Sequence, residues 1–286
     1  MLHLTDHMIP GLISIDYLVP EYPCIVVTNK HATARIALHG AHVIDFIPAD
    51  EKPVIFTSSD AVFKEGKAIR GGIPVCWPWF NAHPTDPELP SHGYARIAFW
   101  QLFRSFDSED FTTLVFTFSK EGLHAELTLE IGRELSLSLK TINTGDSSVL
   151  VGGALHSYFL VSDIEDIYVA GLEGTTFHDS LTGLAKVENE TITFSEEIDR
   201  VYQNTNQEVV LHDKQWKREI CIAKTGSKST VVWNPWIEKS ASMGDLGNED
   251  YKNFVCIETA NALEDVYHVG PGKAHTLTTT ISVSSS

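Results

Sequence analysis

The sequence has little of what several common classes of protein require. It contains four cysteines among 286 residues, far apart and without a CxxC pair, which argues against a disulfide framework or a structural zinc site. No apolar run is long enough to cross a bilayer, and the N-terminus lacks the basic segment and continuous apolar core of a signal peptide. These absences predict a cytoplasmic protein with buried, reduced thiols and no membrane partner.

Nucleotide-binding and serine-nucleophile motifs are also missing. The chain has no phosphate-cradling P-loop, no GxGxxG dinucleotide pattern and no GxSxG nucleophile elbow. Among its 13 histidines, His39 and His42 lie near one strand-like stretch, and His83 and His92 flank a proline-rich loop. No acid or cysteine completes a recognisable three-ligand set with them. We therefore expect neither a cofactor nor a metal.

Positive charge is scarce. Lys and Arg together number 21 against 38 Asp and Glu, which gives a formal net charge of −17. Such a surface repels nucleic acid and anionic lipid, so no nucleic-acid partner is expected. An anionic substrate would have to be attracted locally, by a few placed arginines.

No stretch carries a helical period beyond a turn or two, whereas apolar and polar residues alternate from Pro23 onward. The residues 125–142 form a predicted hairpin that turns at Gly132-Arg133. Turn signals without any linker or composition shift favour one all-β domain over 1–286, a sandwich or barrel of antiparallel strands with few short helices. The predicted strands are Ala32–Leu38, Ile97–Phe106, Thr113–Phe118, Ala125–Ile131, Leu135–Ile142, Ser148–Phe159, Ile164–Val169, Thr191–Phe194, Glu208–Leu211, Glu219–Ala223, Ser229–Trp233, Phe254–Glu258 and His275–Val283.

The most unusual stretch is residues 69–100, IRGGIPVCWPWFNAHPTDPELPSHGYARIAFW. A connection this long is usually functional or disordered, and its aromatic residues argue for order. A purely structural interpretation is that the glycines shape turns and the tryptophans fill the core. Arg70 and Arg96, however, stand near the two ends of the stretch, and arginine presents a planar fork of donors suited to carboxylate or phosphate. With His92, they could line a site for an anionic, hydroxyl-rich ligand.

Three later residues are candidates for chemistry. His156 lies in the apolar string VLVGGALHSYFLV; a lone histidine there is more often a core residue, but histidine is the commonest general acid or base. Glu258 ends the apolar string FVCIE, and buried acids are rare unless paired or functional. Asp199 precedes a polar loop and could simply cap a turn. The acidic stretch 243–251 is interpreted as a solvated face.

Several strings together resemble one family. IRGGIPVCWPWF, LPSHGYAR, ALHSYFLVSDI, IDRVY, NPWIEKSASMGDLG and FVCIETANA look like the glucose-6-phosphate 1-epimerases, or hexose-6-phosphate mutarotases, of the aldose 1-epimerase superfamily. They occur in the right order from about residue 69 to 262. The chain departs from the family at Asn81-Ala82-His83 and at Thr259, which puts the shape of the pocket rim in doubt.

The resemblance implies a galactose-mutarotase-like β-supersandwich and a cofactor-free epimerase acting on D-glucose 6-phosphate or a related hexose 6-phosphate. It implies that Glu258 takes the proton of the C1 hydroxyl while protonated His156 gives one to the ring oxygen. The substrate-binding residues that it implies are Arg70, His92, Arg96 and Asp199. The expected partner is a small sugar phosphate, and a monomer is expected.

Two alternatives remain open at this stage. A non-catalytic sugar-phosphate-binding module on the same fold would use the aromatic and arginine stretch but would not need His156 and Glu258 together. A glycosidase or lyase is the other, although a typical glycosidase needs two carboxylates astride the scissile bond. Only Glu258 has a strand context that suggests such a role.

Overall fold

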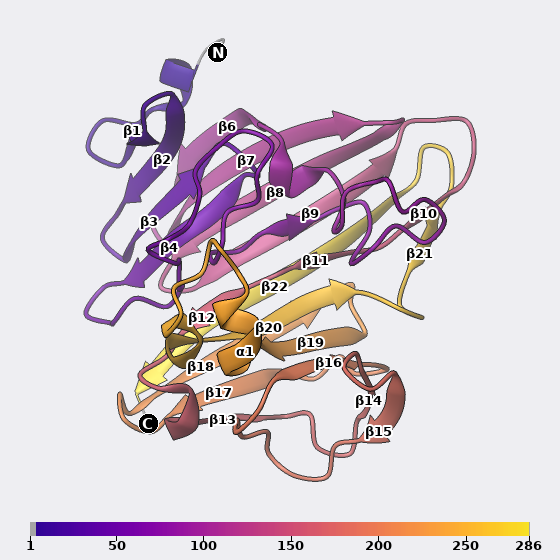
Figure 1. Ribbon diagram of the computed structural model, residues 1–286. Coiled ribbons are helices and arrows are strands. Elements are labelled where there is room, and N and C mark those ends of the chain that lie inside the picture. Colours follow the sequence, from indigo (N-terminus) through magenta and orange to yellow (C-terminus); the bar gives the residue numbers. More distant parts are fainter. Residues whose placement is uncertain (1–3, 286) are drawn as a thin grey trace.

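Two eight-stranded antiparallel sheets dominate the computed structural model, which describes residues 4–285 (Figure 1). Sheet I has the order β15-β14-β16-β19-β20-β11-β5, with β12 also paired to β20. Its strands are β5 (Val75–Cys76), β11 (Gly153–Leu155), β12 (Tyr158–Leu160), β14 (Thr176–Asp179), β15 (Leu184–Val187), β16 (Ile198–Tyr202), β19 (Ser229–Asn234) and β20 (Phe254–Asn261).

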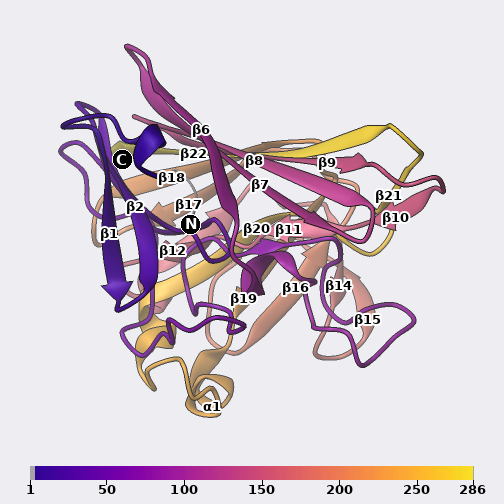
Figure 2. The same ribbon diagram turned by 90° about the horizontal axis from the view of Figure 1, so that it is seen from above.

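Sheet II has the order β13-β17-β18-β22-β9-β8-β7-β6 and contains the longest strands. It lies beside sheet I in both views (Figures 1 and 2). Its strands are β6 (Gln101–Asp107), β7 (Phe111–Lys120), β8 (Leu123–Gly132), β9 (Leu135–Asn143), β13 (Ile167–Ala170), β17 (Val209–Asp213), β18 (Arg218–Thr225) and β22 (Ala274–Ser285).

Smaller elements complete the structure. A four-stranded N-terminal sheet, β1-β2-β3-β4, and a two-stranded ribbon, β10-β21, are also antiparallel. These strands are β1 (Ile13–Val19), β2 (Tyr22–Thr28), β3 (Ala32–Ala37), β4 (His42–Pro48), β10 (Val149–Val151) and β21 (Tyr267–Val269). The helices are short: α1 (Trp236–Ala241) and the 3₁₀ turns η1 (Leu4–His7), η2 (Ala95–Ile97), η3 (Ile164–Asp166) and η4 (Asp250–Asn253).

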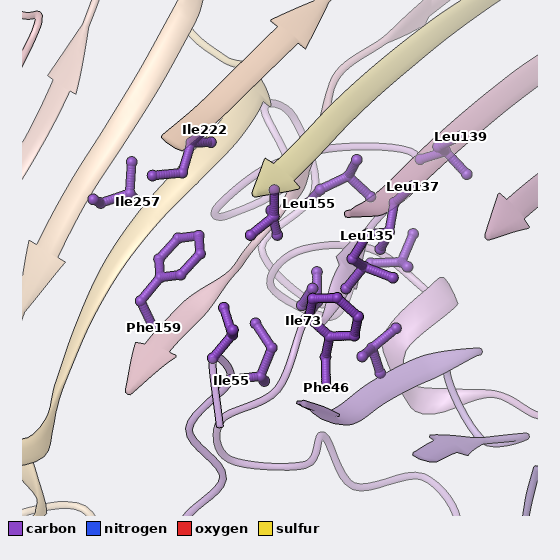
Figure 3. Close-up of a cluster of buried hydrophobic side chains, with 14 of the residues drawn as sticks. Phe46, Ile55, Ile73, Leu135, Leu137, Leu139, Leu155, Phe159, Ile222 and Ile257 are labelled. Atoms are coloured by element: carbon purple, nitrogen blue, oxygen red, sulfur yellow. The ribbon is translucent and has the colours of Figure 1, made fainter. Parts of the chain in front are cut away.

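The main core lies between the two large sheets. Leu137 on β9 and Ile222 on β18 belong to the same buried cluster as Leu155, Phe159 and Ile257 of sheet I (Figure 3). Side chains along a strand alternate between the two faces of a sheet, so the apolar alternation read in the sequence is the inward face of each strand. Burial of this face supplies the main driving force for folding.

The strand β20 is buried on both faces, whereas many strands of an antiparallel sheet expose one face to water. Val255 and Ile257 point into the main core, whereas Cys256 and Glu258 point to the opposite face of sheet I. That outer face is covered by side chains from other segments: Phe80 packs in a cluster with Ala260, and Phe56 and Leu246 pack in a cluster with Cys256. A polar group on this face is therefore removed from bulk water although it lies outside the main core.

The all-β class with few short helices is confirmed, and so is the hairpin at Gly132-Arg133, where Ile131 pairs with Leu135. The thiol prediction is confirmed for three of the four cysteines. Cys24, Cys76 and Cys256 are buried, but Cys221 is only half-buried, so that part of the prediction is wrong; all four are free. Among residues 4–285, no helix is long and apolar enough to span a membrane.

Some predicted strands are wrong. Residues 148–159 form three short strands instead of one. The backbone leaves the ladder at Gly152, whose N–H donates to the carbonyl oxygen of Pro78, and at His156, where the N–H of Ser157 turns back to the carbonyl oxygen of Leu155. Residues 191–194 form no strand: Ile192 exchanges two hydrogen bonds with Val169 and stops there. The apolar alternation in 191–194 arises because Ile192 and Phe194 reach the core, and not because the segment pairs as a strand. The predicted strands at 97–106 and 164–169 begin later, after 3₁₀ turns.

Removing a core side chain should cost far more than removing an exposed one of the same kind. Leu127 is fully buried and Leu184 is 60% exposed. We predict that Leu127→Ala lowers the free energy of unfolding by about 2–5 kcal/mol, whereas Leu184→Ala changes it by less than about 0.5 kcal/mol. Urea unfolding followed by tryptophan fluorescence measures both, and equal losses would contradict the described core.

Candidate active site

His156 and Glu258 meet on the outer face of sheet I. His156 lies in the break between β11 and β12, and Glu258 lies on the neighbouring β20. The imidazole Nε2 is 3.3 Å from the carboxylate Oε1. His156 is 8% exposed and Glu258 is 1% exposed. Two groups that are distant in the sequence thus form a nearly dry acid–base pair.

Burial controls the protonation of this pair. Loss of water raises the pKa of Glu258 well above its ordinary value of 4.5, and the charge of Asp199 raises it further. Burial also lowers the pKa of His156 well below 6.5, with further lowering by His92 and the cations Arg96 and Arg70. Both shifts disfavour the charged forms. Burial therefore favours the neutral form of each group: the protonated carboxyl of Glu258 and the unprotonated imidazole of His156.

Aromatic rings fix the plane of the imidazole. Tyr158 stacks on His156 with ring centroids 4.9 Å apart and an interplanar angle of 11°. Trp233 and His92 approach the same ring edge-on, at 6.2 and 6.0 Å. Within residues 4–285, His156 Nδ1 and Glu258 Oε2 are buried and have no hydrogen-bond partner. Buried polar atoms are normally satisfied, so unpaired atoms at this pair indicate a place where a ligand or water binds.

Arg96 lies close enough to influence the pair. Its charge acts on the pKa of His156 and of Glu258. One amino nitrogen, Nη2, donates to the carbonyl oxygen of Ser91 at 3.0 Å. Its Nε is buried without a hydrogen-bond partner, and no carboxylate in the described part of the chain forms an ion pair with it. A cation left open in this way suits an anionic ligand.

Arg70 is held differently. Its Nε and Nη2 donate to the two carboxylate oxygens of Asp245, at 3.1 and 3.3 Å, and Nη1 donates to the hydroxyl of Tyr158 at 3.1 Å. Arg70 is therefore hydrogen-bonded to Tyr158, whose ring stacks on His156. Its guanidinium has a fixed orientation and a local counter-charge.

His92 and Asp199 border the same region. His92 has a φ of 63° and accepts a hydrogen bond from the backbone N–H of Asn81 at Nδ1. Burial and the cations Arg96 and Arg70 lower its pKa to about 3, so it is a neutral hydrogen-bonding group. Asp199 lies on β16 directly opposite Trp233 of β19, and burial raises its pKa. It is a strand residue, not the cap of a turn.

Two glycines of the segment 69–100 have structural reasons to be glycine. Gly72 and Gly93 have φ values of 69° and 75°, a region that favours glycine. A Cβ on Gly72 would lie 2.2 Å from His42 Nε2, and one on Gly93 would lie 2.0 Å from the carbonyl oxygen of Trp77. The segment is thus packed tightly against its supports, which holds His92 and Arg96 in place.

The structure brings all six predicted site residues into one region, through direct contacts or through the effect of one charge on another's pKa. Tyr158, Trp233 and Asp245 also belong to this region and were not predicted as site residues. Asp245 lies in the acidic stretch interpreted as a solvated face, and its ion pair with Arg70 shows that interpretation to be wrong for this residue. Within residues 4–285, no group of three His, Cys, Asp or Glu side chains could hold a metal ion.

Comparisons with known proteins agree with this geometry. The sequence pattern of the aldose 1-epimerase family matches residues 23–282, and the chain belongs to that family. It is 35% identical over 255 residues to a provisionally named glucose-6-phosphate 1-epimerase of Escherichia coli, with 85% of each chain covered. A similar protein of the plant Cenchrus ciliaris, named in the same provisional way, is 33% identical over 268 residues, 85% of this chain and 79% of the relative.

Solved structures extend the comparison. A provisionally named mutarotase from Salmonella typhimurium superposes with a TM-score of 0.91 and 30% identity, over 98% of this chain and 96% of the other. A galactose mutarotase-related enzyme from Lactobacillus acidophilus has a TM-score of 0.72 at 14% identity, over 92% and 97% of the two chains, and shows the shared fold alone. The predicted mutarotase-like β-supersandwich is confirmed. The molecule is a sugar epimerase of the mutarotase type.

The pKa directions predict a bell-shaped pH dependence. The pair works with one proton, so activity is lost when His156 also becomes protonated, which occurs well below pH 6.5, and when Glu258 loses its proton, which occurs well above pH 4.5. We expect the acid limb of kcat/KM to lie below pH 6.5 and the alkaline limb to lie above pH 4.5. The profile should be measured on an aldose without a phosphate, such as glucose, because a phosphate group itself titrates near pH 6. An acid limb centred at or above pH 6.5 on glucose would contradict the described burial.

Proposed function

We propose that this protein interconverts the α and β anomers of D-glucose 6-phosphate, or a closely related hexose 6-phosphate, by acid–base opening and reclosure of the ring. The observation that carries the proposal is the buried contact between His156 and Glu258, which places an acid and a base 3.3 Å apart and leaves two of their polar atoms without a partner. The names of the relatives in Escherichia coli and Cenchrus ciliaris support the choice of substrate.

The reaction needs a base and an acid on neighbouring oxygens. Transfer of the carboxyl proton from Glu258 to His156 turns the neutral pair into a carboxylate and an imidazolium. Glu258 then removes the proton from the C1 hydroxyl while His156 protonates the ring oxygen. The bond from C1 to the ring oxygen breaks and the C1 carbonyl forms.

Rotation about the C1–C2 bond presents the other face of the aldehyde. His156 takes back the proton of the ring-oxygen hydroxyl as that oxygen attacks C1, and Glu258 returns a proton to the carbonyl oxygen. Return of a proton from His156 to Glu258 then restores the starting state of the pair, so no oxidant, metal or other cofactor enters the proton balance. The stacked ring of Tyr158 would keep the imidazole aimed at the sugar through both steps.

Binding of the phosphate is assigned to the two arginines and that of the sugar hydroxyls to His92 and Asp199. Arg96 supports this role best, because its Nε is buried without a partner beside the acid–base pair. Charge-assisted hydrogen bonds to phosphate are strong, and at a net charge of −17 the protein needs such a local attraction. Neutral His92 and the carboxylate of Asp199 can hydrogen-bond hydroxyl groups.

Replacing either member of the pair should abolish most of the acceleration. Each positioned proton transfer is worth about 10²–10⁴-fold, so we expect losses of that order in His156→Asn and Glu258→Gln, measured by NMR exchange between anomers. The matched controls are His212→Asn and Glu219→Gln, because these residues form another His–Glu contact, of 3.1 Å, on sheet II. Wild-type exchange in either site variant would refute the assignment. Retained sugar-phosphate binding by a wild-type protein that does not accelerate exchange would instead make it a binding module.

Removing Arg96 should distinguish phosphorylated from free sugar. A hydrogen bond to a charged group contributes about 1.5–3 kcal/mol, so we expect Arg96→Ala to raise KM for glucose 6-phosphate more than about tenfold and to leave KM for glucose almost unchanged. Arg70→Ala should act in the same direction but less, because Asp245 already compensates its charge. Arg133→Ala, at the exposed hairpin turn, is the control. Equal effects on both sugars would remove the phosphate role.

A further inference from the structure

Asp245 contacts the proposed anion site through a firmly held loop. It follows α1 and precedes Leu246, which is 3% exposed and packs in a cluster with Phe56 and Tyr158. Five residues later, the carboxylate of Asp250 accepts hydrogen bonds from Ser58 Oγ at 2.7 Å and from a backbone N–H of the loop at 3.0 Å. Asp245 is therefore held in place by its neighbours and does not depend on Arg70 for its position.

The contact uses a large part of the hydrogen-bonding capacity of Arg70. Arginine has five N–H donors. Two nitrogens face the carboxylate of Asp245 and the third faces Tyr158, so about two N–H groups remain for a ligand. Both partners of the ion pair are partly accessible, at 25% and 28% of their side-chain surface. The ion pair thus lies where a ligand could reach it.

The two arginines of the proposed subsite consequently differ in charge balance. Arg70 has a carboxylate partner, whereas Arg96 has none among the described residues. A subsite with two uncompensated guanidinium groups would bind any phosphate dianion strongly, whatever is attached to it. With one guanidinium compensated, more of the binding must come from the sugar hydroxyls.

We propose that Asp245 is a positioning residue that compensates the charge of Arg70 and so weakens the binding of inorganic phosphate to this subsite. This inference rests on the proposed phosphate role of the arginines. It predicts that the carboxylate opposes anion binding although it orients the arginine. Asp245 touches no reacting atom and acts only through Arg70.

The test uses Asp245→Asn, which keeps an oxygen acceptor for Arg70 and removes the charge. Inorganic phosphate is the probe, and its dissociation constant is measured by calorimetry and as a competitive inhibition constant against glucose 6-phosphate. An ion pair at a partly exposed site corresponds to about a fivefold change in an equilibrium constant. We therefore expect the dissociation constant of inorganic phosphate to fall about fivefold in Asp245→Asn. The kcat/KM for free glucose should stay at the wild-type value, which a general structural defect would not allow.

The matched control is Glu249→Gln, which removes one negative charge from the same loop at a side chain that is 74% exposed and paired with Lys252. Unchanged or weaker phosphate binding in Asp245→Asn, with Arg96→Ala weakening it as expected, would overturn the role of Asp245 alone. Equal tightening in Glu249→Gln would also overturn it, because the effect would then be one of general charge. If Arg96→Ala and Arg70→Ala both bind phosphate like the wild type, the anion subsite itself is refuted.

Discussion

The removal of His156 and Glu258 from water is the constraint on which the rest of the structure depends. In water these groups would be an ordinary base and an ionised acid. At 8% and 1% exposure they face each other across 3.3 Å, and burial favours the neutral form of each. That environment requires a cover over the outer face of sheet I, to which Phe80 of the segment 69–100 and Leu246 contribute. The core between the two sheets packs against the other face of β20 through Val255 and Ile257.

Few uncompensated charges lie around the pair of His156 and Glu258. A net charge of −17 keeps anions away from most of the surface, while two titratable neighbours of the pair are neutral or compensated. His92 is held neutral, and Arg70 is matched by Asp245. Arg96 is left as the open cation. An acidic protein can in this way present one small basic spot without becoming a general anion binder.

Much of this could be predicted from the sequence. The period-two alternation identified the fold class because each large sheet buries one face, and the resemblance of ordered motifs pointed to six residues that the fold does bring together. Contacts between distant segments could not be predicted. Nothing in the string SASMGDLG shows that Asp245 reaches Arg70, 175 positions earlier. The break at His156 was missed because an apolar run looks the same whether its backbone stays regular or turns within the strand.

The central claim is that the buried pair acts on a phosphorylated sugar. The most direct measurement is two-dimensional NMR exchange spectroscopy of the wild-type protein with glucose 6-phosphate and, separately, with glucose at the same concentration. The account predicts accelerated exchange between the α and β anomers of both sugars, with a higher kcat/KM for glucose 6-phosphate. No acceleration, or an equal kcat/KM for the two sugars, would contradict it.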